Sequence, residues 1–145
     1  MPIDEFRIRV TVNAPLELVW EHLVDWKSQS NWMALTTVTS SADNGRNSGI
    51  GTDIKAFTGV GRFGILDEMR IVKWEPPKFC AVDHYGRWIK GIGEFHLVRT
   101  SDQVTRFDWY EKIHAPKLLL ALLKPGILIA VRYSLQRFAR TVSKS

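Results

Sequence analysis

The chain opens with a strict alternation of apolar and polar residues over positions 6–13, FRIRVTVN. Such alternation predicts a strand that buries one face. Pro15 then favours the start of a helix, with Asn13 or Ala14 at the cap. A short second helix is predicted over residues 27–33. The first helix buries a stripe of residues at helical spacing, which are Leu16, Val19, Trp20 and Leu23.

Short apolar segments separated by turn residues fill the middle of the chain and predict six further strands. A polar, glycine-rich loop at 42–51 follows the first of them. Glu75-Pro76-Pro77 ends the third, because proline cannot donate to a sheet. Pro116 opens a final helix that runs to about residue 142, and Pro125 inside it predicts a bend. The six predicted strands cover residues 35–40, 52–58, 65–74, 79–84, 90–99 and 104–113.

This order of elements predicts an α+β fold with an antiparallel sheet. Consecutive strands are joined by short turns, and no helix between the later strands is available for a parallel crossover. The longest apolar run, residues 118–131, is too short to span a membrane. We expect it to pack across the concave face of the sheet, with Leu135, Phe138 and Val142 continuing the buried stripe. No repeat or linker divides residues 1–145, so we expect one domain.

The composition narrows the functional classes. With 45% apolar and 24% charged residues among 145, this is an ordinary globular sequence. The C-terminal segment is strongly basic, because residues 112–145 hold seven basic residues and no acidic one, so we expect no general nucleic-acid-binding surface. Cys80 is the single cysteine and forms no intrachain disulfide. The first ten residues are charged and do not resemble a signal peptide, so we expect a cytoplasmic protein.

Two patterns that could indicate a cofactor lack the required context. Residues 59–64, GVGRFG, match the GxGxxG spacing of dinucleotide sites. The segment that follows, 65–74, is too short for the crossover helix of such a site, so we interpret the glycines as a hairpin turn. The four histidines lack metal-ligand spacing. We therefore expect neither a metal nor a cofactor.

Strand alternation places chemistry-bearing residues on the inner face of the sheet. Phe107, Trp109 and Glu111 share one face of the last strand, and basic residues lie on the other, which argues against stacking of nucleic-acid bases. A mainly aromatic face with few polar groups is typical of a small-molecule pocket, and equally of a core with polar residues at its rim. The predicted ligand-binding residues are Trp32, Met33, Val82, His84, Phe95, Phe107, Trp109 and Glu111.

Glu111 and His84 are the candidate catalytic residues, as acid or base. A carboxylate among aromatic rings loses hydration, which favours its protonated form and raises its pKa. A carboxyl group with a pKa near neutrality can exchange protons with a ligand. The alternative is that Glu111 lies at the mouth of the cavity, hydrated or paired with a lysine or arginine.

Three stretches resemble the START-like, helix-grip superfamily, also called SRPBCC. In residues 10–33, VTVNAPLELVWEHLVDWKSQSNWM, an Ala-Pro helix start is followed by Trp20 and, twelve residues later, by Trp32. Glu75-Pro76-Pro77 resembles the end of a family hairpin. RYSLQRFARTV, residues 132–142, resembles the basic end of the long C-terminal helix. The chain is most similar to the polyketide cyclase/dehydrase and lipid-transport branch.

The resemblance implies a seven-stranded antiparallel sheet curled around the C-terminal helix, with a cavity for an apolar ligand. It implies no single function, because the superfamily includes lipid carriers, aromatase/cyclases and hormone receptors. The first hypothesis is a carrier or binder of a lipid, isoprenoid or aromatic polyketide. The second is a cyclase/dehydratase-type enzyme that uses the same cavity, which two or more polar groups converging on one point would favour.

The third hypothesis is an interaction module that docks through its basic C-terminal helix. Its partner would be an acidic protein or the surface of an anionic membrane. This hypothesis would be favoured if four basic side chains form one exposed patch, and these are Arg132, Arg137, Arg140 and Lys144.

Overall fold

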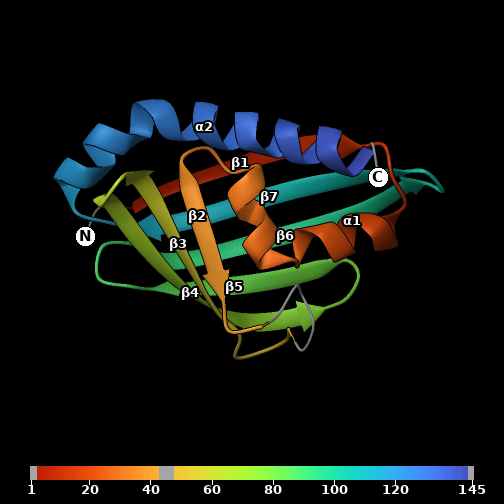
Figure 1. The fold of residues 1–145 in the computed structure, drawn as a ribbon, viewed down its shortest axis with the longest axis horizontal. Helices are drawn as coiled ribbons and strands as arrows, with labels where there is room; N and C mark the ends of the chain where they lie inside the picture. The colour runs from red at the N-terminus through yellow and green to blue at the C-terminus, as the bar shows by residue number, and fades with distance from the viewer. Residues whose placement is uncertain (1–2, 43–47, 144–145) are drawn as a thin grey trace.

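The computed structural model describes residues 3–42 and 48–143. It shows a seven-stranded sheet in the order β1-β7-β6-β5-β4-β3-β2, in which every neighbouring pair is antiparallel. The α+β helix-grip fold expected from the sequence is therefore confirmed (Figure 1). The strands are β1 (Ile3–Val12), β2 (Thr36–Ser40), β3 (Asp53–Val60), β4 (Phe63–Glu75), β5 (Phe79–Tyr85), β6 (Lys90–Ser101) and β7 (Val104–His114). The helices are α1 (Leu16–Leu23), η1 (Trp26–Asn31) and α2 (Lys117–Ser143).

The first connection differs from the prediction in one detail. The residue before α1 is Pro15, in an extended conformation and without a side-chain cap, so the predicted cap at Asn13 or Ala14 is wrong. A contact from β7 holds this connection, because the buried Thr105 hydroxyl donates to the carbonyl of Ala14 at 2.8 Å. The second helix, η1, is a 3₁₀ helix, and the predicted loop at 42–51 lies partly outside the described residues.

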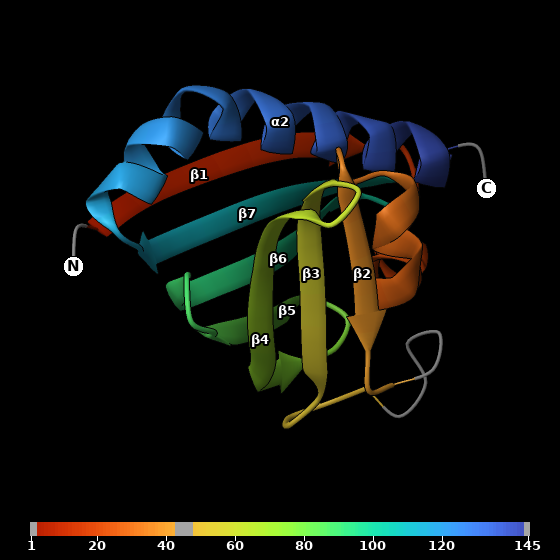
Figure 2. The ribbon, with the colours of Figure 1, turned by 60° about the vertical axis from the view of Figure 1, so that its left-hand side comes forward.

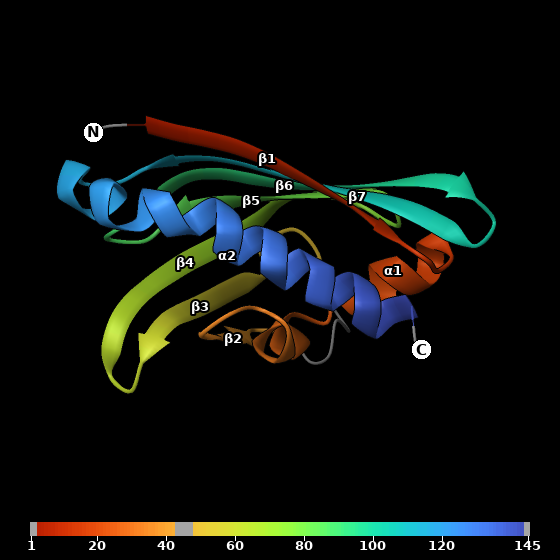
Figure 3. The same ribbon diagram turned by 90° about the horizontal axis from the view of Figure 1, so that it is seen from above.

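The sheet curls, and α2 lies across its concave side (Figures 1 and 2). Seen from above, α2 crosses over the sheet from end to end (Figure 3). Its C-terminal half buries Leu135, Phe138 and Val142, each at most 1% exposed, as the helical spacing predicts. The opposite side of this half is solvated and exposes Arg132 and Arg137. This part of α2 therefore closes the core.

At the described positions of its N-terminal half, α2 is buried at some and exposed at others. Leu120 and Val131 are buried, but Leu118 and Ile129 are 73% and 72% exposed, so the expectation that the whole apolar run faces the sheet is wrong for these two positions. Only one stripe of a helix can contact a single surface. The first turns of α2 run at an angle to the rest of the helix (Figure 2). The side chain of Pro125, where the bend was predicted, lies outside the described residues.

The glycine-rich motif forms the turn of the β3–β4 hairpin, as predicted. Val60 pairs with Phe63 across the two-residue connection, and Gly61 has a φ of 61°, which glycine adopts without strain. The strand that follows pairs antiparallel with its predecessor rather than crossing over through a helix. The context of a dinucleotide site is therefore missing at this motif.

Candidate functional site

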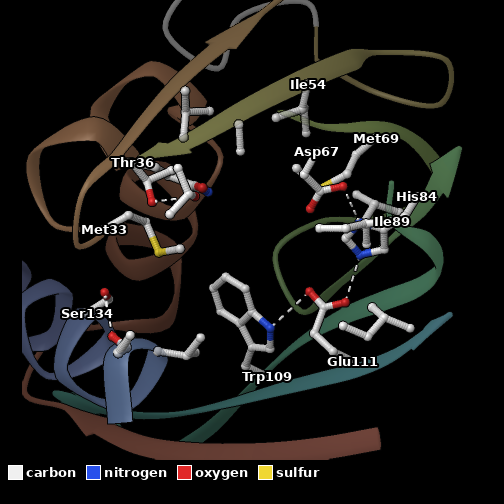
Figure 4. A pocket seen from close by; sticks show the side chains of 18 of the residues that line it. Met33, Thr36, Ile54, Asp67, Met69, His84, Ile89, Trp109, Glu111 and Ser134 are labelled. Carbon is white, nitrogen blue, oxygen red and sulfur yellow. Dashed lines mark hydrogen bonds and ion pairs between the residues drawn. The ribbon is translucent and has the colours of Figure 1, made fainter. Parts of the chain in front are cut away.

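A cavity of about 420 Å³ lies between the concave face of the sheet and α2 (Figure 4). Its wall is mostly apolar and includes residues from η1, from all seven strands and from α2. Met33 and Met69 are among the flexible side chains that face it, and Trp26 and Phe95 are among the aromatic ones. A cavity of this volume and lining is typical of small-molecule sites.

Six of the eight predicted ligand-binding residues line this cavity. These six are Met33, Val82, His84, Phe95, Trp109 and Glu111. The other two, Trp32 and Phe107, are buried in the adjoining core and are not part of the described lining. Both pack against Phe138 of α2, with ring centroids 4.8 Å and 5.7 Å from it. Their place in the structure is to hold the helix against the sheet.

A polar cluster of three side chains interrupts the apolar wall. The Nε2 atom of His84 lies 2.7 Å from Oε2 of Glu111, and its Nδ1 atom lies 2.8 Å from Oδ1 of Asp67. The indole Nε1–H of Trp109 donates to Oε1 of Glu111 at 3.1 Å. Figure 4 shows these groups side by side at one end of the cavity. We call Asp67, His84 and Glu111 the acid–histidine cluster.

The cluster is largely removed from water. The side chains of His84 and Glu111 are 3% and 7% exposed, and that of Asp67 is 20% exposed. Glu111 is thus inside the wall rather than hydrated at the mouth, and its partner is an imidazole rather than a lysine or arginine. The alternative reading of Glu111 as a hydrated rim residue does not fit this burial.

Strand alternation explains how each member of the cluster reaches the cavity. On β7 the buried positions are Thr105, Phe107, Trp109, Glu111 and Ile113, so Glu111 is the one ionisable residue on a mainly apolar face. His84 follows Val82 on the inner face of β5 and pairs with Met69 of β4. Asp67 lies two residues before Met69 on that same face of β4.

Sequence reasoning missed Asp67, although a signal was present. The segment 65–71 alternates between an inner set, Ile65, Asp67, Met69 and Ile71, and an outer set. A single acid within an apolar alternating face is the same pattern that identified Glu111. Applied to every strand, that criterion would have selected Asp67.

A glycine makes room for the buried carboxylate. Gly93 of β6 is the cross-strand partner of Glu111. A Cβ atom at this position would lie 2.9 Å from both carboxylate oxygens of Glu111, which is closer than non-bonded atoms normally approach. Any larger residue at position 93 would therefore push the carboxylate aside. Gly93 is a second position of the candidate site that the sequence pattern did not reveal.

The acid–histidine cluster shifts the pKa values of its members. Burial by itself would lower the pKa of His84, but the charge of Glu111 and the hydrogen bonds to Asp67 and Glu111 outweigh it and raise that pKa well above its ordinary value of 6.5. Burial raises the pKa of Glu111, and the nearby His84 opposes this rise. We therefore expect an imidazolium held between two carboxyl groups at neutral pH.

These shifts predict how the stability of the protein depends on pH. His84 binds its proton more tightly in the folded than in the unfolded chain, so its contribution to stability is complete below about pH 6.5 and is lost as pH rises through the raised folded pKa. Glu111 also has a raised pKa, so its contribution likewise declines with rising pH. We expect the free energy of unfolding, measured with urea, to fall from pH 6.5 to about pH 9, below tyrosine ionisation.

The matched control for this pH experiment is Glu111→Gln. It removes the largest influence that raises the pKa of His84, so the fall in stability over the same pH range should become shallower. A wild-type protein whose stability rises across this interval would contradict the assignment of a protonated, stabilised His84.

The sequence matches one protein family over nearly its whole length. Residues 4–143 match the family described as polyketide cyclase / dehydrase and lipid transport. The chain belongs to this family. No curated protein matches the sequence. The family includes both carriers and cyclases by its description, so membership leaves the activity of this chain to be argued from its cavity.

Several solved structures share the fold at low sequence identity. The Zhui aromatase/cyclase from a Streptomyces species is 14% identical, with a TM-score of 0.76 over 99% of this chain and 95% of that one. A norcoclaurine synthase from Thalictrum flavum is 13% identical, with a TM-score of 0.69 over 99% and 96%. A conserved protein from Geobacillus kaustophilus is 12% identical, with a TM-score of 0.75 over 98% and 97%. These similarities show the helix-grip fold.

Proposed function

We propose that the protein binds a mostly apolar small molecule in the cavity between the sheet and α2, and places a polar group of that molecule against Glu111. The observation that carries this proposal is a mostly apolar cavity of about 420 Å³ whose described wall holds one buried cluster of ionisable groups. Apolar contacts give such a site its affinity, and a few fixed polar groups orient the ligand. The family description, which includes lipid transport, supports the proposal.

A variant that fills the cavity tests this proposal. Ala56 of β3 is partly buried and lines the cavity, so Ala56→Phe should occupy space that the ligand needs. We expect the affinity for naphthalene, measured by equilibrium dialysis, to fall by at least about tenfold, or 1.4 kcal/mol. Native mass spectrometry of the protein purified from its own host should also show a bound small molecule that Ala56→Phe has lost.

Lys55→Phe is the matched control, because Lys55 is exposed on the opposite face of the same strand. It adds the same aromatic ring without entering the cavity and should leave naphthalene binding unchanged. Equal binding by wild type and Ala56→Phe would show that the ligand site lies elsewhere.

Acid–base catalysis is the second candidate function, and the acid–histidine cluster favours it. Three ionisable groups meet at one point of an apolar cavity, which is more than orientation of a ligand requires. In a dehydration, Glu111 would accept the proton from a carbon beside a carbonyl. The electron pair of that C–H bond would form the C=C bond as the neighbouring C–O bond breaks, and the proton would leave with the hydroxyl as water. The aromatase/cyclase and synthase names of two similar structures agree with an enzyme.

The catalytic candidate can be tested without knowing the substrate. We would follow deuterium exchange at the carbon beside the carbonyl of tetralone by NMR, with wild type and Glu111→Gln. A catalyst should accelerate the exchange, and the variant should lose the acceleration while still binding naphthalene. Exchange at the uncatalysed rate with wild type would leave binding as the function.

Contact with membranes through α2 stays a separate prediction. Arg132, Arg137 and Arg140 are exposed on this helix, and Ile129 beside the cavity wall is 72% exposed, while Lys144 lies outside the described residues. Among the described residues no helix is long and apolar enough to cross a membrane. Sedimentation with liposomes should show more binding to anionic than to neutral vesicles, and the difference should shrink in added salt. Equal binding to both would argue against an electrostatic contact.

A further inference from the structure

We propose that the cavity selects ligands whose polar end donates a hydrogen bond, a hydroxyl or a protonated amine, and excludes those that end in a carboxylate. This inference rests on the proposed binding function and names the chemical class of its ligand. Two independent inventories of the described cavity wall carry it, one of charges and one of hydrogen-bond donors.

The charge inventory is one-sided. Among the described residues that line the cavity, the charged groups are Asp67, Glu111 and the imidazolium of His84, and none is a lysine or an arginine. Two carboxylates around one imidazolium leave a net charge of minus one. A ligand carboxylate would add a second negative charge in a site with little water, where no described cation is available to balance it. A hydroxyl adds no charge, and an ammonium group would neutralise the excess.

Donors within the cluster are already in use. Both ring nitrogens of His84 face carboxylate oxygens, and the indole N–H of Trp109 donates to Glu111. A bound carboxylate accepts hydrogen bonds only, so it would find no free donor here. The carboxylate of Glu111 can accept about four hydrogen bonds. It has two partners in the cluster, the imidazole of His84 and the indole of Trp109, so it can still accept a hydrogen bond from a ligand.

The hydroxyl groups at the other end of the cavity are committed in the same way. The Thr36 hydroxyl donates to the carbonyl of Ala34 at 2.8 Å, so in the 2.9 Å pair with Thr58 the donor is Thr58. The Ser134 hydroxyl donates to the carbonyl of Ala130 at 2.8 Å. Gln29 also lines the cavity, and one N–H of its amide donates to the carbonyl of Leu23 at 3.4 Å. Acceptors therefore outnumber the remaining side-chain donors on the described wall, which again favours a ligand that donates.

A matched set of bicyclic aromatic probes separates these contributions. Naphthalene has no polar group, and naphthol, naphthylmethylamine and naphthoic acid add a hydroxyl, an ammonium and a carboxylate to the same ring system. We would measure all four affinities at neutral pH by equilibrium dialysis. Naphthol and naphthylmethylamine should bind at least about tenfold more tightly than naphthoic acid, as one hydrogen bond to a charged group implies.

Two neutralising variants assign the selectivity to the cluster. In Glu111→Gln the preference for naphthol over naphthoic acid should fall at least about threefold, because one negative charge is gone. Asp67→Asn neutralises the more exposed carboxylate and should shift the preference in the same direction, so it replaces Glu111→Gln if that variant does not fold. Glu94→Gln is the control, because it removes a carboxylate that pairs with His96 outside the cavity. It should keep the wild-type preference.

The outcomes distinguish this inference from the proposed function. If wild type binds none of the four probes, the binding function itself is wrong. If it binds naphthalene but holds naphthoic acid as tightly as naphthol, the cavity binds apolar molecules and the inferred selectivity is overturned. A preference that both cavity variants leave unchanged would also overturn it, since the selectivity would then arise away from the cluster.

Discussion

Replacing His84 with leucine is expected to lower the free energy of unfolding by about 3–5 kcal/mol at neutral pH. The side chain of His84 is 3% exposed and carries hydrogen bonds to Asp67 and Glu111. Leucine fills similar space but leaves two carboxyl groups without their cation. The buried Glu111 must then keep an uncompensated charge or take up a proton, and both cost free energy. Urea denaturation followed by tryptophan fluorescence measures the loss.

If the loss of stability in His84→Leu comes from stranded carboxyl groups, it should depend on pH and on a second substitution. Without His84 the pKa of Glu111 rises further above its ordinary value of 4.5, so its protonation at low pH should shrink the loss. Adding Glu111→Gln to His84→Leu removes the stranded charge, and the double variant should be more stable at neutral pH than His84→Leu alone. A loss below about 1 kcal/mol, or a double variant that is less stable still, would mean that the cluster is not a buried charge network.

The strands were predictable because each has a local signature. Alternation over 6–13 and 104–113 identified β1 and β7 directly, and Glu75-Pro76-Pro77 marked the end of β4. Helix boundaries depend on tertiary contacts as well. The residue before α1 lacks a side-chain cap, and the connection is held by the hydroxyl of Thr105, which donates to the carbonyl of Ala14. These two residues lie 91 positions apart in the chain, so no local sequence pattern could predict their contact.

The candidate site was only half predictable. Alternation predicted that Glu111 and His84 face the inner side of the sheet, because the pattern within a single strand decides on which side each side chain lies. That they are 2.7 Å apart depends on the order β5-β6-β7 and on Gly93 between them, and pairing register is set by contacts far apart in the chain. The positions of Trp32 and Phe107, in the core beside the described cavity wall, could not be predicted for a related reason. An inward aromatic ring can line a cavity or fill the core, and only the position of α2 decides which.

Phe138 shows how much depends on that helix, and Phe138→Ala is expected to lower the free energy of unfolding by about 3–5 kcal/mol. The residue is 1% exposed and packs against Trp32 after η1 and Phe107 of β7, so one side chain joins three elements. Replacing the ring with a methyl group removes its buried surface and both aromatic contacts. It also leaves a cavity, which the sheet and the helix cannot fill by moving closer to each other. Urea denaturation at neutral pH measures the effect.

Arg137→Ala is the control for this prediction, because the neighbouring arginine is exposed on the same helix and should change stability by less than about 0.5 kcal/mol. The two variants also separate packing from helix propensity. Alanine favours a helix at either position, so a loss confined to Phe138→Ala must come from the core. Because α2 forms part of the cavity wall through Ala130, Val131 and Ser134, Phe138→Ala should weaken naphthalene binding as well. Unchanged stability and binding would show that α2 is held by its other contacts, and that the contacts of Phe138 with Trp32 and Phe107 are dispensable.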